Sequence, residues 1–98
     1  MQNIKLDLNN PQFQSDLLAL QHSEQLAILR TLKKMLKMTW QQIYQDPGLK
    51  WEAISKYAPQ GQRIYSFRFS QKYRATAIRQ AEHLCILSLN VDHDSAYH

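Results

Sequence analysis

The chain contains few of the residues that interrupt regular structure, and it cannot build cysteine-based sites. Its 98 residues include two glycines, three prolines and one cysteine. A single cysteine excludes an internal disulfide and a cysteine-based zinc cluster. Cys85 lies in an apolar run, where a buried structural thiol is expected.

Long hydrophobic runs are also missing. No stretch approaches the roughly 20 apolar residues that a membrane-spanning helix needs. The first residues, Met1 to Lys5, lack the apolar core of a signal peptide. A cytoplasmic location without membrane contact is therefore expected.

Length and charge bound what the chain can be. We expect residues 1–98 to form a single domain, because a chain this short has room for only one core. Hydrophobic residues make up 44% and charged residues 20%, which is typical of a folded protein. Twelve Lys and Arg against eight Asp and Glu give a net charge of +4. This excess suits a polyanionic partner, either a nucleic acid or an acidic protein segment.

One short strand and then helices are predicted in the first part of the chain. Residues 4–8 alternate apolar and polar side chains, as a strand with one buried face does. Asn10 is placed to cap a short helix that begins at Pro11. Residues 23–37 predict a longer helix, with apolar side chains at three- and four-residue steps. Those apolar positions are Leu26, Leu29, Leu32, Met35 and Leu36.

Two further helical segments are predicted before the character of the sequence changes. Thr39 and Gln42 fit the spacing of a capping box, so a short helix is expected to begin there. The turn-forming residues 46–48 end it. One more helical turn is predicted from the three-residue spacing of Trp51, Ile54 and Tyr57.

The last third of the chain has the composition of a sheet. Residues 63–69, 73–79 and 84–90 are rich in aromatic and branched side chains, and short polar segments separate them. They predict a three-stranded antiparallel meander that follows the helical half.

The first hairpin of this meander allows a test of register. A three-residue loop at 70–72 pairs Phe69 with Tyr73 and Arg68 with Arg74, whereas a two-residue loop mixes aromatic and arginine side chains on both faces. Only the three-residue loop keeps the aromatic and arginine side chains on separate faces, so the pattern favours that loop. One face then holds Tyr65, Phe67, Phe69, Tyr73, Ala75 and Ala77, and the other holds Ser66, Arg68, Arg74 and Thr76. Two guanidinium groups side by side repel each other, so an anion, either phosphate or carboxylate, is expected between them.

Arg68 and Arg74 are the leading candidates for phosphate contact. The planar guanidinium offers paired donors to phosphate oxygens and keeps its charge at any working pH. The alternative is that each arginine pairs with an acid on a solvated sheet face. A second basic group lies on the long helix, where a row of cations could displace counterions from RNA phosphates or could simply be a solvated face. Its members are Arg30, Lys33, Lys34 and Lys37.

The end of the chain supplies a titratable group. His93 follows the last predicted strand and could exchange a proton near neutral pH, with Asp92 or Asp94 orienting it. The alternative is an exposed terminal histidine. A metal site from these residues and His98 is not expected, because no His-x-x-x-His pattern or cysteine pair supports it. We therefore predict no metal and no other cofactor.

These residues resemble the RelE/ParE superfamily of toxins. Residues 65–75 look like the Ser-x-Arg-apolar-polar-x-x-aromatic-Arg hairpin of its HigB-like members. Residues 46–52 are similar to the Leu-Lys-x-Glu segment that precedes the sheet in YafQ-like members. His93 and Tyr97 match their terminal His-x-x-x-aromatic pair. The resemblance runs from Asp46 onward, and the helices before it fit only as a general layout.

The resemblance implies an α+β domain with helices packed on one face of an antiparallel sheet. It implies a toxin that an antitoxin neutralises and that cleaves mRNA on the ribosome without a metal or small-molecule cofactor. His93 would act as acid or base, Arg68 and Arg74 would stabilise charge on the phosphate, and Tyr97 would orient or stack. Lys50 and Lys72 join the expected nucleic-acid-binding residues.

Two departures from the family pattern bear on the activity. Asp92 and Asp94 flank the histidine, where many relatives have a small or basic residue; carboxylates are unfavourable beside RNA but favour a protonated imidazole. Ser66 and Arg68 occupy the strand where some relatives carry a second histidine. The alternative function is therefore a ParE-like gyrase inhibitor, or an inactive protein that binds antitoxin or nucleic acid.

Overall fold

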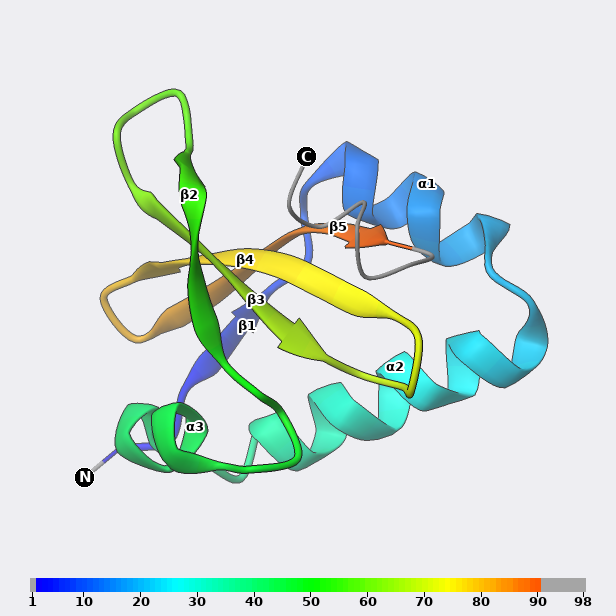
Figure 1. Cartoon of the computed structure of the whole chain (residues 1–98), viewed down its shortest axis with the longest axis horizontal. Coiled ribbons are helices and arrows are strands. Elements are labelled where there is room, and N and C mark those ends of the chain that lie inside the picture. The colour runs from blue at the N-terminus through cyan, green and yellow to red at the C-terminus, as the bar shows by residue number, and fades with distance from the viewer. Residues whose placement is uncertain (1, 91–98) are drawn as a thin grey trace.

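The computed structural model describes residues 2–90, which form three helices and one five-stranded sheet (Figure 1). The strands lie in the order β1-β5-β4-β3-β2. In chain order the elements are β1 (Lys5–Asp7), α1 (Pro11–Ala19), α2 (His22–Met35), α3 (Trp40–Gln45), β2 (Glu52–Tyr57), β3 (Arg63–Arg68), β4 (Arg74–Gln80) and β5 (His83–Asn90).

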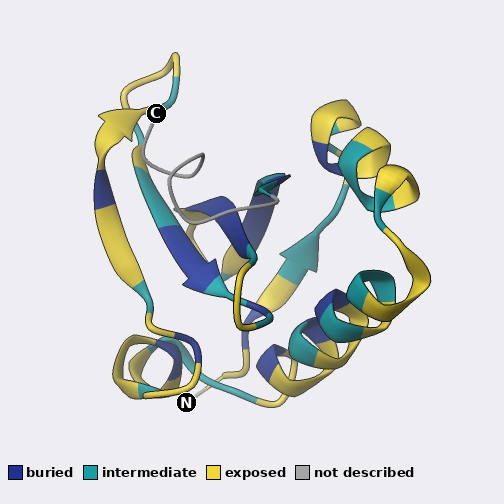
Figure 2. Cartoon of the chain, turned by 45° about the vertical axis from the view of Figure 1, so that its right-hand side comes forward, coloured by how far each residue is buried: buried dark blue, intermediate teal, exposed yellow. Residues whose placement is uncertain are grey.

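The core lies between the helices and one face of the sheet. Each helix contributes buried apolar side chains, and β3, β4 and β5 supply the opposing surface (Figure 2). The principal members are Phe13, Ile28, Leu32, Met35, Ile43, Phe67, Phe69, Ala75, Ala77, Leu84, Ile86 and Leu89. The predicted α+β architecture, with helices in the N-terminal half, is confirmed.

Side-chain caps fix where two of the helices begin. The Asn10 side chain accepts hydrogen bonds from the backbone N–H groups of Gln12 and Phe13, and Pro11 occupies the first turn of α1. Thr39 and Gln42 form the predicted capping box at the start of α3. Both caps satisfy backbone donors that would otherwise have no partner in the helix.

The buried stripe of α2 agrees with the predicted one only at Leu32 and Met35. Ile28, Leu32 and Met35 are buried, whereas Leu26, Leu29 and Leu36 are exposed. Leucines occur all around this helix, so spacing alone did not select the stripe that faces the sheet. Packing of α2 against the sheet buries the stripe that contains Ile28.

The helical turn predicted around Ile54 is wrong, because this segment forms the edge strand β2. Its backbone pairs with β3 in antiparallel register, Glu52 opposite Ser66 and Tyr57 opposite Arg63. Gly61, with φ 88°, closes the connecting loop. The spacing of the apolar residues gave the wrong prediction because three apolar positions within seven residues suit a twisted edge strand as well as a helical turn. Only the free edge of β3 decides between them.

The predicted meander is confirmed as β3, β4 and β5, and their bounds agree with the predicted ones to within one residue at each end. The N-terminal strand was also predicted, but not its place. It pairs with β5 in parallel, with Leu6 opposite Leu84, so the otherwise antiparallel sheet has one parallel edge. Cys85 is buried on β5, as expected.

Candidate nucleic-acid interface

The hairpin of β3 and β4 brings the two predicted arginines together. Arg68 lies opposite Arg74, and the pairs Phe67 with Ala75 and Ser66 with Thr76 follow in the same register. The Phe69 N–H donates to the Tyr73 carbonyl at the end of the ladder. The register predicted from the three-residue loop is therefore confirmed.

The two arginines have different surroundings. Arg74 is buried, with 4% of its surface exposed. Its Nε and Nη2 atoms donate to the hydroxyl of Ser66 at 3.2 and 2.9 Å, and Nη2 also donates to the Lys50 carbonyl at 2.9 Å. The Glu52 carboxylate lies 3.5 Å from the same nitrogen. For Arg74, the protein itself therefore supplies an anionic partner.

Arg68 is half-buried and lines a cavity of about 220 Å³ between α2 and the β3–β4 loop. Its backbone N–H donates to the Leu49 carbonyl at 2.7 Å, which fixes the strand against the segment before β2. Within residues 2–90 its guanidinium has no carboxylate at ion-pair distance. The walls of the cavity are formed by Thr31, Lys34, Gly48, Leu49, Arg68, Phe69, Ser70 and Gln71.

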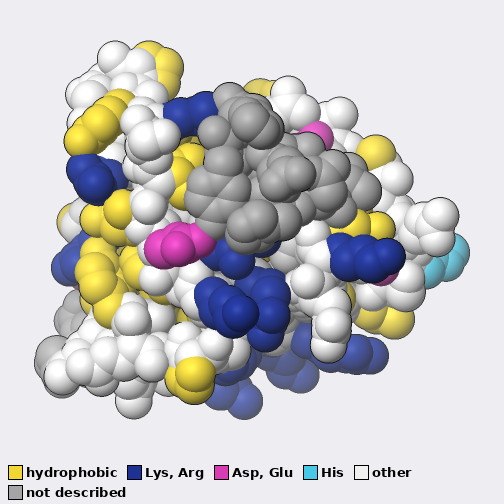
Figure 3. Space-filling model, viewed as in Figure 1, with side chains coloured by type: hydrophobic (Ala, Val, Ile, Leu, Met, Phe, Trp, Pro, Cys, Tyr) yellow, Lys and Arg dark blue, Asp and Glu magenta, His cyan; other side chains and the backbone are white. Residues whose placement is uncertain are grey.

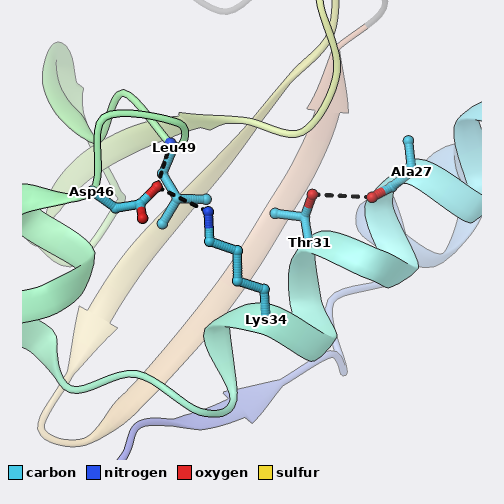
Figure 4. Close-up of polar contacts among 5 residues, drawn as sticks. All are labelled: Ala27, Thr31, Lys34, Asp46 and Leu49. Carbon is cyan, nitrogen blue, oxygen red and sulfur yellow. Dashed lines mark hydrogen bonds and ion pairs between the residues drawn. The ribbon is translucent and has the colours of Figure 1, made fainter.

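A turn between α3 and β2 forms one wall of this cavity. Figure 4 shows the contacts that Asp46 makes in this turn. The Asp46 carboxylate accepts from the Lys34 ammonium at 3.0 Å and from the Leu49 N–H at 2.9 Å. Burial acts to raise the pKa of Asp46, but these hydrogen bonds outweigh it, so the pKa lies below its ordinary value of 3.8. Lys50 follows with a φ of 48°, a left-handed conformation that its carbonyl bond to Arg74 stabilises.

The four basic residues predicted on the long helix separate into two groups. All four are exposed, but only Lys34 lines the cavity beside Arg68. Arg30 and Lys33 lie elsewhere on the surface of α2, and Lys37 lies in the turn just beyond the end of the helix at Met35. Lys50 and Lys72 are exposed in the loops before β2 and between β3 and β4. Figure 3 shows basic side chains gathered at the centre of one face, beside an acidic group.

The predicted proton-transfer group belongs to the end of the chain. His93, Tyr97, Asp92 and Asp94 lie outside the described residues, as does His98. Within residues 2–90, no cluster of three or more His, Cys, Asp or Glu side chains could hold a metal ion.

Two polar residues of the site were missed in the sequence. Ser66 is fully buried and accepts two hydrogen bonds from Arg74, and Glu52 places its carboxylate beside the same guanidinium. The register did place Ser66 on the arginine face, which was a usable signal. Glu52 could not be found in this way, because the predicted helical turn removed it from the sheet.

Comparison with known proteins adds information on the fold. No protein-family model matches the chain, and no curated protein matches it. A copper-bound mutant toxin from Helicobacter pylori has a similar structure, with a TM-score of 0.55 and 21% sequence identity over 94% of this chain and 97% of that one. At this identity the likeness establishes a shared fold over nearly the whole of both chains.

None of the helices in the described part of the chain is both long and apolar enough to cross a membrane.

Proposed function

We propose that the protein is the toxin of a type II toxin–antitoxin system, and that it cleaves mRNA on the ribosome without a metal. The observation that carries this proposal is the cavity beside the β3–β4 loop that Arg68 and Lys34 both line. The similarity in fold to a bacterial toxin supports it, and so does the resemblance of the hairpin to RelE/ParE toxins.

The chemistry required is attack by a ribose 2′-hydroxyl on the adjacent phosphate. The 2′-oxygen forms a bond to phosphorus, and the bond to the 5′-oxygen of the next nucleotide breaks. One proton must leave the 2′-hydroxyl and another must reach the departing oxygen, while negative charge on the phosphate is stabilised. In the proposed site Arg68 supplies the stabilising charge, and its guanidinium matches the geometry of two phosphate oxygens.

Arg74 has a positioning role in this proposal. Its donors hold Ser66 and the carbonyl of Lys50, so it fixes the turn that forms the cavity wall. Its own charge is offset by Glu52. His93 is proposed as the acid or base and Tyr97 as an orienting group, with Asp92 and Asp94 beside the histidine.

The proposed partners are a cognate antitoxin, mRNA and the ribosome. An acidic segment of the antitoxin would neutralise the protein by covering Arg68 and its neighbouring lysines, because opposite charge favours fast and selective pairing.

Mapping RNA ends in cells that express the protein tests the proposal. New internal cuts in mRNA, together with growth arrest, are expected for the unmodified chain, and His93→Ala and Arg68→Gln should abolish the cuts. Lys56→Gln, an exposed substitution on β2, is the matched control and should leave them unchanged. DNA damage without mRNA cuts would instead establish the gyrase-inhibitor function. The absence of both effects would indicate a protein that binds without catalysis.

A further inference from the structure

A second hollow lies at the other end of β4, outside the cavity of Arg68. It has a volume of about 300 Å³, at the lower end of the roughly 300–1,000 Å³ of small-molecule sites. It shares no lining residue with the first cavity. The lining side chains are Trp40, Gln41, Tyr44 and Gln45 from the start and body of α3, and Arg79 from β4.

The aromatic wall of this hollow is rigidly supported. The Trp40 Nε1–H donates to the Ala81 carbonyl at 3.1 Å, which fixes the indole against the β4–β5 turn. The Tyr44 ring stacks on Trp51 with centroids 5.6 Å apart and planes 28° apart. Trp51 in turn stacks on Tyr65 and Phe67, which anchor it to the sheet. Tyr44 is the outer member, with 43% of its surface exposed.

Arg79 places a positive charge over these rings. Its guanidinium carbon lies 4.5 Å from the centroid of Trp40 and 5.9 Å from that of Tyr44. Nη1 donates to the Tyr44 hydroxyl at 3.4 Å and Nε to the Ala81 carbonyl at 3.5 Å, so donors remain for a ligand. No carboxylate within residues 2–90 lies at ion-pair distance from this arginine.

We propose that this hollow binds one nucleotide of a single-stranded RNA, apart from the position where cleavage is proposed. The base stacks against the exposed ring of Tyr44, and Arg79 contacts the adjoining phosphate. Stacking platforms next to cations are how proteins hold single-stranded nucleic acid. The Gln41 and Gln45 amides, one helical turn apart on α3, are placed to meet the polar edge of a base.

The charge at the hollow favours this occupant over an apolar segment of protein. An apolar segment would bury the Arg79 guanidinium without an acidic partner, which is costly. A nucleotide has a flat apolar base to stack on the Tyr44 ring and a phosphate anion to pair with the Arg79 guanidinium.

Binding of an uncleavable RNA tests the proposal without relying on catalysis. The probe is a ten-nucleotide 2′-O-methyl oligoadenylate, which keeps bases and phosphates but lacks the attacking hydroxyl. Both tryptophans of the chain belong to the aromatic cluster of the hollow, so their fluorescence reports occupancy. Affinities from titration are compared, because the substitutions also alter the starting fluorescence.

Arg79→Gln and Tyr44→Leu are expected to weaken binding about tenfold, the scale of losing one stacked base. Tyr44→Phe keeps the ring and should bind as the unmodified protein does. Arg63→Gln is the matched control, because this arginine also lies over a tyrosine ring, Tyr57, but at the sheet edge. Thermal melting confirms folding, and Arg79→Gln decides the result if Tyr44→Leu does not fold.

The proposal is overturned by unchanged affinity in Arg79→Gln, by equal loss in Arg63→Gln, or by equal affinity for an abasic oligomer of the same length. Adenosine monophosphate binding as tightly as the oligomer would identify a site for free nucleotides instead, and this too contradicts the proposal. Arg68→Gln separates the two sites. This variant should abolish cleavage, and adding Arg79→Gln to it should still weaken binding in the fluorescence titration.

Discussion

At the scale of single residues, the two arginines of the hairpin differ in their surroundings. They occupy paired positions in the same ladder, yet one is exposed to the cavity and the other is buried with partners. The strand ladder gives both the same sheet face, but the surrounding segments differ. The turn before β2 reaches Arg74 and leaves the guanidinium of Arg68 without an acidic partner in the described residues.

Replacing Arg74 should therefore weaken the fold. Arg74→Leu removes the donors to the Ser66 hydroxyl and the Lys50 carbonyl, and unsatisfied buried groups cost about 1–3 kcal/mol. We expect the free energy of unfolding, measured by urea denaturation, to fall by this amount. Arg74→Lys keeps the charge but cannot reach both acceptors, so it should rescue the loss only in part. Full stability in the leucine variant would refute the positioning role.

Replacing Arg68 should instead affect activity. Arg68→Gln is expected to change the unfolding free energy by no more than about 0.5 kcal/mol, as for other surface changes. The rate of mRNA cleavage should fall roughly 100- to 1,000-fold, the scale of removing one donor to a developing oxyanion, which leaves no cuts detectable in cells. Both quantities can be measured on the same purified sample. A large loss of stability without a change in rate would show that Arg68 is structural.

Asp46 makes the cavity wall sensitive to acid. Its folded-state pKa lies below the ordinary value of 3.8, so its stabilising effect is complete above that pH. The effect is lost as the pH falls through the lowered pKa, because the unfolded chain then binds the additional proton. Asp46→Asn should lower stability at pH 7 and flatten the decline between pH 5 and 3, measured by denaturation across pH. An identical decline in both proteins would contradict this.

At the scale of elements, α3 depends on its cap. It spans only Trp40–Gln45, and a helix this short has few internal hydrogen bonds. It also carries the aromatic side chains of the second hollow, so its start fixes their positions.

Removing the cap tests this dependence. Thr39→Ala should lower the free energy of unfolding by about 1 kcal/mol, the usual cost of losing an N-cap hydroxyl. Thr39→Ser keeps the hydroxyl and serves as the control. If both variants match the unmodified protein in thermal melting, the packing of Trp40 and Ile43 alone holds the helix.

At the scale of the whole molecule, the excess of positive charge supports the binding of a polyanion. The net charge is +4, and Lys50, Arg68 and Lys72 lie on or beside the loops at the proposed site. If these three and Arg79 contact phosphates, the slope of log affinity against log salt should be about −3, since each contact to single-stranded nucleic acid contributes roughly −0.7.

The slope also identifies the contacts. Arg68→Gln should reduce its magnitude by roughly 0.7, whereas Lys56→Gln on β2 should not change it. Titrations of the uncleavable oligomer at several salt concentrations measure this. Binding that is independent of salt would contradict a phosphate interface.

The sequence determined the elements in which local chemistry acts alone. Asn10, Pro11 and Thr39 specify helix starts through hydrogen bonds within a few residues. The alternation along 63–69 and 73–79 specifies the hairpin register, because a slip of one residue would put aromatic side chains in water. The pairing of Arg68 with Arg74 follows from that register.

Tertiary structure decided what depends on partners far along the chain. Segment 52–57 forms a strand because it pairs with the otherwise unpaired edge of β3. Ile28 is buried because the sheet packs against that side of α2. The same long-range contacts separated two equivalent arginines, burying Arg74 against Lys50 and Glu52 and leaving Arg68 at the cavity. Periodicity fixes which side chains share a face, but only packing fixes what that face meets.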